Sequence, residues 1–281
     1  MTRVLVAGSS GQVGNAIIQL LSQNEKYEVL GLSHKDLDIS SRTSTLNAIH
    51  EFKPNVVFNG AAMTNVDLCE SEKDRAYAIN SIGVRNLVAG CADVDAHLIH
   101  LSTDFVFDGE KKVPYTEFDA PNPQSIYALS KLGGDNEALR YEKATILRVA
   151  WVFGKTGQDF FAWVLNGVKD NSIKALIGDA ISSPTYSKDI ATVAQAIMGH
   201  KIYGLINVAN SGEVSRLEMG QEILRRANIN VELEPITQES LNRPAKRPLY
   251  SALSCSTLEI LTGIKMRSWQ EALDEHYETF K

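Results

Sequence analysis

The chain has 281 residues, of which 44% are apolar and 22% charged, a composition typical of a globular protein. Its length suits one large α/β domain, or such a domain with a smaller lobe. The net charge is −6, from 28 basic and 34 acidic side chains, and the sequence contains no run of lysine and arginine. These features argue against nucleic acid and membrane surfaces as partners, and no apolar run approaches the length of a membrane span.

The three cysteines, Cys69, Cys91 and Cys255, are far apart, odd in number and free of any Cys-x-x-Cys spacing. This pattern indicates reduced thiols rather than a disulfide framework or a zinc site. The first residues lead directly into an apolar strand and leave no room for a signal peptide. We therefore expect a cytoplasmic protein.

A glycine-rich loop joins the first predicted strand, residues 3–8, to a helix with apolar periodicity at 16–21. Gly8 permits a tight turn, Gly11 lets the backbone approach a pyrophosphate, and Gly14 lets the helix pack close to the strand. The free N–H groups at the start of the helix would face the phosphates. The residues expected to contact a dinucleotide here are Gly8, Ser10, Gly11, Gln12, Val13 and Gly14.

The end of the second predicted strand, residues 27–32, bears on the choice of cofactor. NAD-binding chains commonly place an acidic residue there, whereas this chain has Ser-His-Lys at 33–35. These side chains suit a 2′-phosphate and favour NADPH. NADH stays the alternative, because Asp36 or Asp38 could take the acidic role. The expected cofactor contacts in this segment are Ser33, His34, Lys35, Asp38 and Ile39.

A third strand, residues 55–59, ends in small residues that let the backbone come close to a ligand, so Ala61 and Ala62 are further candidate cofactor contacts. A long helix is predicted over 71–92, with Asn80 in its middle. Because asparagine is a poor helix-interior residue, Asn80 either faces solvent or has a specific role.

The most informative segment begins with a buried strand at 97–101 and continues through Thr103 to a helix that carries Tyr127 and Lys131. Tyr127 and Lys131 are four residues apart and therefore share one face of the helix. A cation close to a tyrosine lowers the pKa of its phenol, so that the phenol can donate a proton to a carbonyl oxygen. A second hydroxyl, here that of Thr103, can donate a hydrogen bond to the same oxygen. Alone, the Tyr–Lys spacing also fits an ordinary amphipathic helix pair.

A further buried strand is predicted at 144–150, and the alternation of strands and helices predicts a Rossmann-like, doubly wound parallel sheet. Ligands of such sheets lie at the carboxyl ends of the strands. Four candidate residues fall at these ends: Gly8, Ala61, Thr103 and Trp151.

Beyond Gly154 the pattern is looser. The predicted elements are helices at 158–168 and 187–198 and strands at 174–177 and 205–208. We expect an NAD(P)-binding domain at 1–150 and a mainly substrate-binding lobe at 151–281, with segments near 174–209 returning to the Rossmann sheet.

The chain resembles the dTDP-4-dehydrorhamnose reductase family of extended short-chain dehydrogenases/reductases over nearly its whole length. The resemblance rests on GSSGQVG at 8–14, AAMTNVDLCE at 61–70, LSTDFVFDG at 101–109, YALSK at 127–131, RVAWVFG at 148–154, SPTYSKDIA at 183–191 and RPLYSAL at 247–253. It implies that Thr103, Tyr127 and Lys131 are catalytic and that Tyr127 and Lys131 also contact the cofactor. The implied substrate contacts are Thr103, Asp104, Phe105 and Trp151.

Three positions depart from the family pattern. Ala128 replaces a common glycine after the tyrosine, and Ala180 replaces a glutamine, which removes one polar contact. Ala16 stands where some members carry a metal-binding glutamate, so we expect no metal.

The resemblance implies reduction of the 4-keto group of a nucleotide-linked deoxysugar, with a hydride from NADPH or NADH and a proton from Tyr127. It is compatible with a homodimer. One alternative is an epimerase or dehydratase of the same superfamily, although dehydratases usually carry an acidic pair where Asp104 is followed by Phe105. The other is a non-catalytic dinucleotide-binding regulatory subunit, which the motifs alone do not distinguish.

Overall fold

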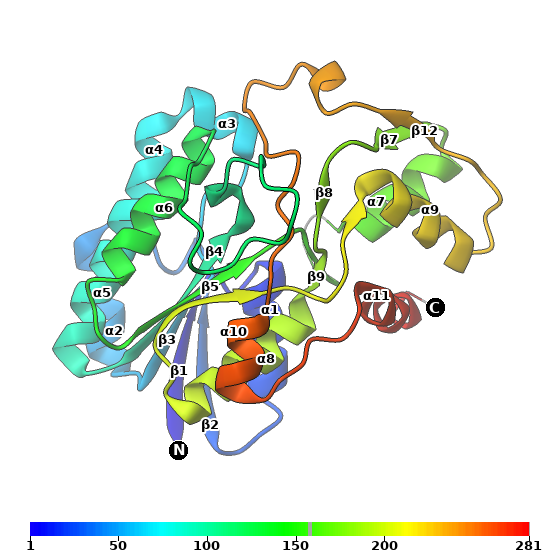
Figure 1. The fold of residues 1–281 in the computed structure, drawn as a ribbon. Helices are drawn as coiled ribbons and strands as arrows, with labels where there is room; N and C mark the ends of the chain where they lie inside the picture. Colours follow the sequence, from blue (N-terminus) through cyan, green and yellow to red (C-terminus); the bar gives the residue numbers. More distant parts are fainter. Residues whose placement is uncertain (157–158, 281) are drawn as a thin grey trace.

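A computed structural model describes residues 1–156 and 159–280, and its centre is a six-stranded parallel sheet (Figure 1). The strands lie in the order β10-β5-β4-β3-β1-β2, and all adjacent pairs are parallel. Their bounds are β1 Thr2–Ala7, β2 Tyr27–Leu32, β3 Val56–Asn59, β4 His97–Thr103, β5 Ala144–Val149 and β10 Gly204–Val208. The predicted doubly wound α/β fold is therefore confirmed.

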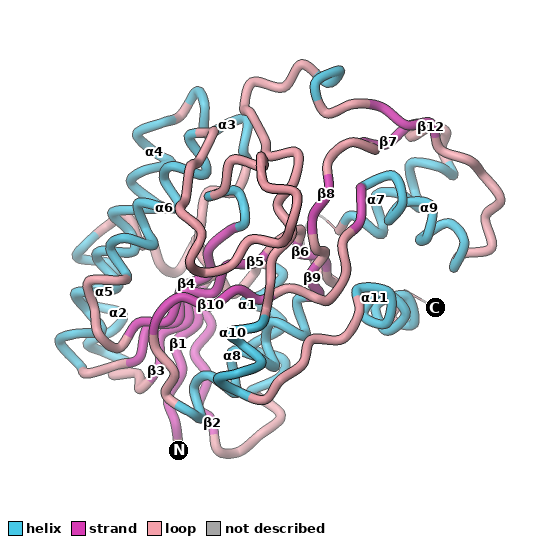
Figure 2. The backbone as a smooth tube through the Cα atoms, in the orientation of Figure 1, coloured by secondary structure: helices cyan, strands magenta, loops and turns pink. Residues whose placement is uncertain are grey.

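Helices cover both faces of this sheet, as Figures 1 and 2 show. One face carries α1 (Gln12–Leu21), α8 (Ser187–His200) and α10 (Ser256–Thr262), and the other carries α2 (Arg42–Phe52), α5 (Gly83–Val94) and α6 (Ile126–Ala138). Since the inner strand β1 is buried on both sides, its successive side chains enter different cores: Val4 and Val6 join one cluster, whereas Leu5 and Ala7 join the other.

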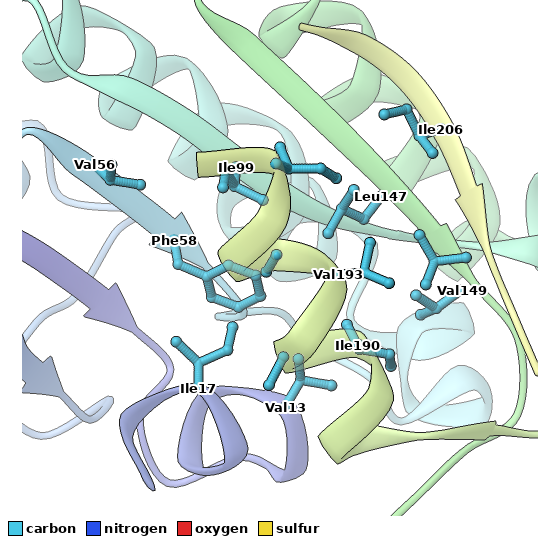
Figure 3. Close-up of a cluster of buried hydrophobic side chains, with 14 of the residues drawn as sticks. Val13, Ile17, Val56, Phe58, Ile99, Leu147, Val149, Ile190, Val193 and Ile206 are labelled. Atoms are coloured by element: carbon cyan, nitrogen blue, oxygen red, sulfur yellow. The ribbon is translucent and has the colours of Figure 1, made fainter. Parts of the chain in front are cut away.

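The core between the sheet and helices α1 and α8 is seen in Figure 3, where Ile17 and Val193 approach the sheet residues Phe58 and Leu147. These side chains are at most 2% exposed. Burial of each large apolar side chain contributes about 1.5–3 kcal/mol. This packing holds the start of α1 against the carboxyl edge of the sheet.

The chain reverses its direction of travel across the sheet between β1 and β3. From β1 it moves outward to β2, and it then returns past β1 to β3 and onward to β10. The connections from β1 and β3 therefore leave on opposite faces and open a crevice at the carboxyl ends of these strands. Ligands of doubly wound sheets bind at such a switch point.

The predicted helix over 71–92 is divided into several pieces. The pieces are α3 (Val66–Ser71), α4 (Lys73–Tyr77), the π-helical turn η1 (Ala78–Ile82) and α5. The break follows from the side chain of Asn80, which is 1% exposed and hydrogen-bonds both the N–H and the C=O of Met63. Of the two interpretations of Asn80, solvent exposure is thus wrong.

A smaller lobe lies beside the carboxyl edge of the sheet. Its helices are α7 (Phe160–Lys169), α9 (Arg216–Arg226) and α11 (Trp269–Glu278), and η3 (Glu239–Leu241) lies in its long loop. Three strand pairs complete it: β6 (Val152–Phe153) with β9 (Thr185–Tyr186), β7 (Ala175–Ile177) with β12 (Glu234–Ile236), and β8 (Ile181–Ser182) with β11 (Val214–Ser215). Within 174–209, α8 and β10 belong to the sheet layers, whereas β7 pairs inside the smaller lobe. The first residue of the helix predicted at 158–168 lies outside the described residues.

No helix within residues 1–156 and 159–280 combines the length and the apolar character needed to cross a membrane.

Candidate active site

A cavity of about 340 Å³ lies at the switch point between β1 and β3. Its walls come from the glycine loop, the segment after β2, the segment after β3, and the helices α4 and η1. The lining residues are Gly8, Ser10, Gly11, His34, Leu37, Asp38, Ile39, Gly60, Ala61, Ala62, Met63, Arg75 and Ile79. Eight of the predicted cofactor contacts are in this set: Gly8, Ser10, Gly11, His34, Asp38, Ile39, Ala61 and Ala62.

The glycine loop has the backbone geometry that its sequence predicts. Gly8 has a φ of +79°, and the N–H of Gly11 donates to the Gly8 carbonyl over 3.1 Å. Helix α1 then begins at Gln12, and Gly11 caps it without a side-chain hydrogen bond. The start of α1 has no side-chain cap and lies at the glycine loop, and a helix start in this position is the arrangement that binds a pyrophosphate. Val13 and Gly14 lie behind this edge, buried against the sheet.

The two acidic residues after β2 are held by nearby serines. Asp36 accepts from the N–H and the hydroxyl of Ser33, and Asp38 accepts from those of Ser40. The Ser33 and Ser40 contacts keep the pKa of each carboxyl below its usual range. Lys35 is exposed and does not line the cavity.

Two buried asparagines hold the cavity wall formed by residues 60–63. Asn59 accepts from the N–H of Ala61 over 3.1 Å and lies 3.0 Å from Nδ1 of His100. Asn80 accepts from the N–H of Met63 over 2.8 Å and donates to the hydroxyl of Ser130. Because Ser130 precedes Lys131 on α6, Asn80 links the cavity wall to the helix that carries Tyr127 and Lys131.

Thr103, Tyr127 and Lys131 come together at the carboxyl end of β4. Thr103 is the last residue of β4, and Ser125 caps α6, which places Tyr127 in the first turn of that helix. Burial raises the pKa of Tyr127, and the nearby Thr103 hydroxyl opposes this rise. Lys131, one turn further along α6, donates from Nζ to the carbonyl of Leu101 over 2.6 Å.

The electrostatics of this group differ from the sequence-based expectation. Burial raises the pKa of the Tyr127 hydroxyl, and the nearby Asp104 carboxylate raises it further. Lys131 was expected to lower it, but its ammonium group is directed at the Leu101 carbonyl and at His100. Burial also lowers the pKa of Lys131 to about 8, with Asp135 opposing this shift. The raised pKa of Tyr127 is therefore set mainly by burial, and the expected effect of Lys131 does not contribute to it.

Asp104 is a meeting point of the two lobes. Its carboxylate accepts from Thr103 over 3.2 Å, from Ser182 over 3.2 Å and from Ser251 over 2.5 Å. It is 2% exposed, and burial raises its pKa to about 6 despite these three donors. Phe105, the next residue, packs edge-on against the ring of Tyr127 with 6.0 Å between centroids.

Trp151 is the second residue after the end of β5 and has a φ of +40°. Few non-glycine residues adopt this left-handed conformation. The guanidinium of Arg216, the first residue of α9, lies 3.7 Å from the centre of the Trp151 ring.

The sequence did not identify several residues of the site. In the cavity these are Leu37, Met63, Arg75 and Ile79, and around Asp104 they are Ser182, Ser251 and Arg216. Arg75 and Ile79 are one helical turn apart beside Asn80, so the unusual asparagine was a usable signal for this wall. Nothing in the local pattern around Ser182, Arg216 or Ser251 connects them to residue 104.

A doubly wound parallel sheet with a glycine loop at its switch point, and with Thr, Tyr and Lys at the neighbouring strand end, defines an extended short-chain dehydrogenase/reductase. The model of one family, described as RmlD substrate binding domain, matches residues 1–281, and the chain belongs to this family.

Relatives of the chain cover it almost completely. The spore coat polysaccharide biosynthesis protein SpsK of Bacillus subtilis is 36% identical over 99% of this chain and 98% of its own. A dTDP-4-dehydrorhamnose reductase of Aggregatibacter actinomycetemcomitans is 36% identical over 97% of each chain. The crystal structure of a dTDP-4-dehydrorhamnose reductase from Bacillus anthracis in complex with NADP is 32% identical, covers 99% of this chain and 100% of its own, and superposes with a TM-score of 0.96.

Proposed function

We propose that this protein is an NADPH-dependent reductase that converts a dTDP-4-dehydrorhamnose type of substrate to its 4-hydroxy product. The observation that carries the proposal is the meeting of Thr103 and Tyr127 at the end of β4, close to the cavity at the switch point. The reductases among its relatives, one of them solved with NADP, support the same substrate and cofactor.

The cavity fits a dinucleotide, because the backbone of Gly8 and Gly11 and the N-terminal end of α1 form a cradle for its phosphates. The hydride of the reaction comes from the bound nicotinamide. In this proposal His34 and the segment around Lys35 face the 2′-phosphate, while residues 60–63 close the opposite wall.

Tyr127 donates the proton to the carbonyl oxygen on which negative charge develops, and Thr103 hydrogen-bonds the same oxygen. In the structure the Thr103 hydroxyl donates to Asp104, so it turns toward the substrate when a carbonyl oxygen enters. Asp104 then keeps Ser182 and Ser251 as donors. Lys131 would hold the ribose of the bound cofactor, and in that position its positive charge would favour the phenolate that Tyr127 becomes on losing its proton.

The proposal is tested by mixing the protein with NADPH and dTDP-4-dehydro-6-deoxy-L-mannose and following the absorbance of the reduced nicotinamide. Stoichiometric oxidation of NADPH with formation of the 4-hydroxy sugar is the expected result. Isomerisation without net consumption of NADPH would instead identify an epimerase. Binding of NADPH without any turnover would identify the regulatory subunit.

We infer further that the protein works in the cytoplasm, which its three unpaired thiols support. We assign the cofactor to residues 1–150 together with α8 and β10, and the nucleotide-sugar to the remainder of 151–281. A homodimer is part of this proposal and is tested by light scattering of the purified protein.

A further inference from the structure

The imidazole of His100 is held in one tautomer. His100 lies in β4 and is fully buried, and its Nδ1 is 3.0 Å from the amide nitrogen of Asn59. The N–H of Ala61 donates to the amide oxygen of Asn59 and thereby fixes the orientation of that amide. Since an amide nitrogen only donates, Nδ1 of His100 accepts, and the ring proton of the neutral imidazole is on Nε2. Burial, and after it Lys131, hold the pKa of His100 well below its usual range, so the ring is neutral.

Nε2 of His100 is close to two groups of opposite charge. It lies 3.5 Å from Nζ of Lys131 and 3.8 Å from Oδ1 of Asp135. Because Nε2 carries a proton, it cannot accept a hydrogen bond from the ammonium, whereas the carboxylate attracts its N–H. The imidazole therefore contacts both groups without bonding the ammonium.

Tyr127, Lys131 and Asp135 follow one another at four-residue intervals on one face of α6. Opposite charges attract at this spacing, so Lys131 could pair with Asp135. In the described part of the chain, Asp135 instead contacts His100 and Arg148, and Nζ of Lys131 donates to the carbonyl of Leu101. A direct pair would draw Nζ along the helix, away from Tyr127.

The Asp135 carboxylate has one oxygen that is engaged and one that is not. Oδ2 lies 3.3 Å from both Nε and Nη2 of Arg148, a buried arginine of β5. Oδ1, the oxygen near His100, has no partner with hydrogen-bond geometry within residues 1–156 and 159–280. Burial raises the pKa of this carboxyl, and Arg148, Ser102 and Lys131 oppose the rise. Because these side chains are almost completely removed from water, Oδ1 attracts the Lys131 ammonium with little screening.

We propose that His100 is a positioning residue that keeps the ammonium of Lys131 apart from the Asp135 carboxylate and so leaves it free for the cofactor and Tyr127. The parts that Lys131 and Tyr127 play rest on the function proposed above. Asp135 acts across the imidazole: it opposes the effect of burial on the pKa of Lys131 and keeps the ammonium charged without binding it. His100 thus separates two effects of the carboxylate, the charge that it maintains on Lys131 and the contact that would immobilise it.

The test measures the ionisation of Lys131 directly and needs no turnover. The full-length protein is labelled with ¹³C at the lysine Cε atoms and titrated by NMR, and the Lys131 signal is identified by its absence from Lys131→Met. His100→Asn keeps an acceptor for the Asn59 amide but is too short to reach between Lys131 and Asp135. His100→Gln keeps an N–H donor near the position of Nε2. Asp135→Asn removes the carboxylate charge.

His97→Asn is the matched control, because it removes a second buried imidazole of β4 that contacts Thr145. Thermal melts establish that each variant is folded. If His100→Asn does not fold, the direction of the shift in Asp135→Asn and the value in His100→Gln decide the matter.

We expect Lys131 to titrate near pH 8 in the parent, where burial has lowered its pKa to about 8. In His100→Asn the direct pair closes, so the pKa of Lys131 rises by about one unit or more. The kcat for the keto sugar falls about tenfold at the same time, since one pKa unit is a tenfold change in equilibrium. In Asp135→Asn the pKa of Lys131 falls instead. His100→Gln and His97→Asn equal the parent.

The proposal is overturned if His100→Asn leaves the pKa of Lys131 unchanged or lowers it, or if Asp135→Asn does not lower it. It is also overturned if His100→Gln or His97→Asn gives the same rise as His100→Asn, because the effect would then not depend on a donor at Nε2.

The outcome separates this proposal from the proposed reaction. The expected shifts of Lys131 in a protein that does not reduce the keto sugar would support the positioning role and refute the reaction. Reduction by His100→Asn with the kcat of the parent would support the reaction and refute the positioning role.

Discussion

The carbonyl oxygen of Gly8 lies where a side chain on Gly14 would have to be placed. A Cβ at Gly14 would sit 2.3 Å from that oxygen, which is closer than any real contact allows. At Gly11 the nearest atom to a Cβ is the same oxygen, but at 3.3 Å. The two glycines of one motif therefore serve different purposes: Gly14 permits packing, whereas Gly11 keeps the space in front of α1 open.

The first prediction concerns these two positions. Gly14→Ala should lower the free energy of unfolding by about 1–3 kcal/mol, the usual cost of overpacking. Gly11→Val should stay folded and lose NADPH binding, because its side chain would occupy the phosphate position. Chemical denaturation and calorimetric titration measure the two effects. Gly199→Ala, where nothing lies within 4 Å of an added Cβ, is the control. Normal NADPH affinity in a folded Gly11→Val protein would place the phosphates elsewhere.

The second prediction concerns the proton donor. Tyr127→Phe should lower kcat roughly a hundredfold or more, the usual contribution of a positioned acid. NADPH affinity should be unchanged, because the substitution removes only the hydroxyl. Steady-state kinetics and cofactor titration check both statements, with the partly exposed Tyr203→Phe as the control. If the Tyr127→Phe variant had the same kcat as the parent, Tyr127 would have only a packing role.

The third prediction concerns the pH dependence of stability. Burial raises the pKa of Asp104 to about 6 from an ordinary value near 3.8, so the folded state holds this proton more tightly than the unfolded state. The resulting stabilisation is fully present below about pH 4 and is lost as the pH rises through 6. Since each pKa unit corresponds to 1.36 kcal/mol, the loss amounts to about 3 kcal/mol.

Asp104→Asn should remove this dependence of the folding stability on pH. The stability of the variant relative to the parent should rise between pH 4 and pH 7 in guanidinium unfolding experiments. Asp36→Asn is the control of opposite sign, because hydrogen bonds from Ser33 lower the pKa of Asp36. Parallel stability curves for the parent and Asp104→Asn would show that Asp104 does not titrate in this range.

The fourth prediction concerns the choice of cofactor. NADPH should give a higher kcat/KM than NADH, and Lys35→Asp should narrow or reverse the preference, because a carboxylate repels the 2′-phosphate. The carboxylates of Asp36 and Asp38 are held by Ser33 and Ser40, which favours Lys35 and His34 as the residues that decide. The control is Lys26→Asp, which makes the same change of charge at the residue before β2. Equal use of both cofactors in the parent and in Lys35→Asp would show that Lys35 is only a solvated loop residue.

Much of the fold was predictable because its determinants are local. Each of these determinants lies within a short segment of the chain. They are the apolar runs of strand length, the glycines at 8, 11 and 14, and the four-residue spacing of Tyr127 and Lys131. Parallel strands also bring their carboxyl ends to one edge, so the sequence placed Gly8, Ala61 and Thr103 correctly at that edge.

Tertiary contacts decided the remaining features. Asn80 interrupts a helix because its amide binds the backbone of Met63, and β7 pairs with β12 across about 60 residues. The Asp104 carboxylate accepts hydrogen bonds from Ser182 and Ser251, which are 78 and 147 residues away in the sequence. Periodicity and local spacing carry no information about such contacts, since they depend on which surfaces meet after the two lobes have packed. The sequence alone therefore determined the sheet and the residues at its edge, whereas only the tertiary structure decided what surrounds Asp104 and Arg216 and how their charges are balanced.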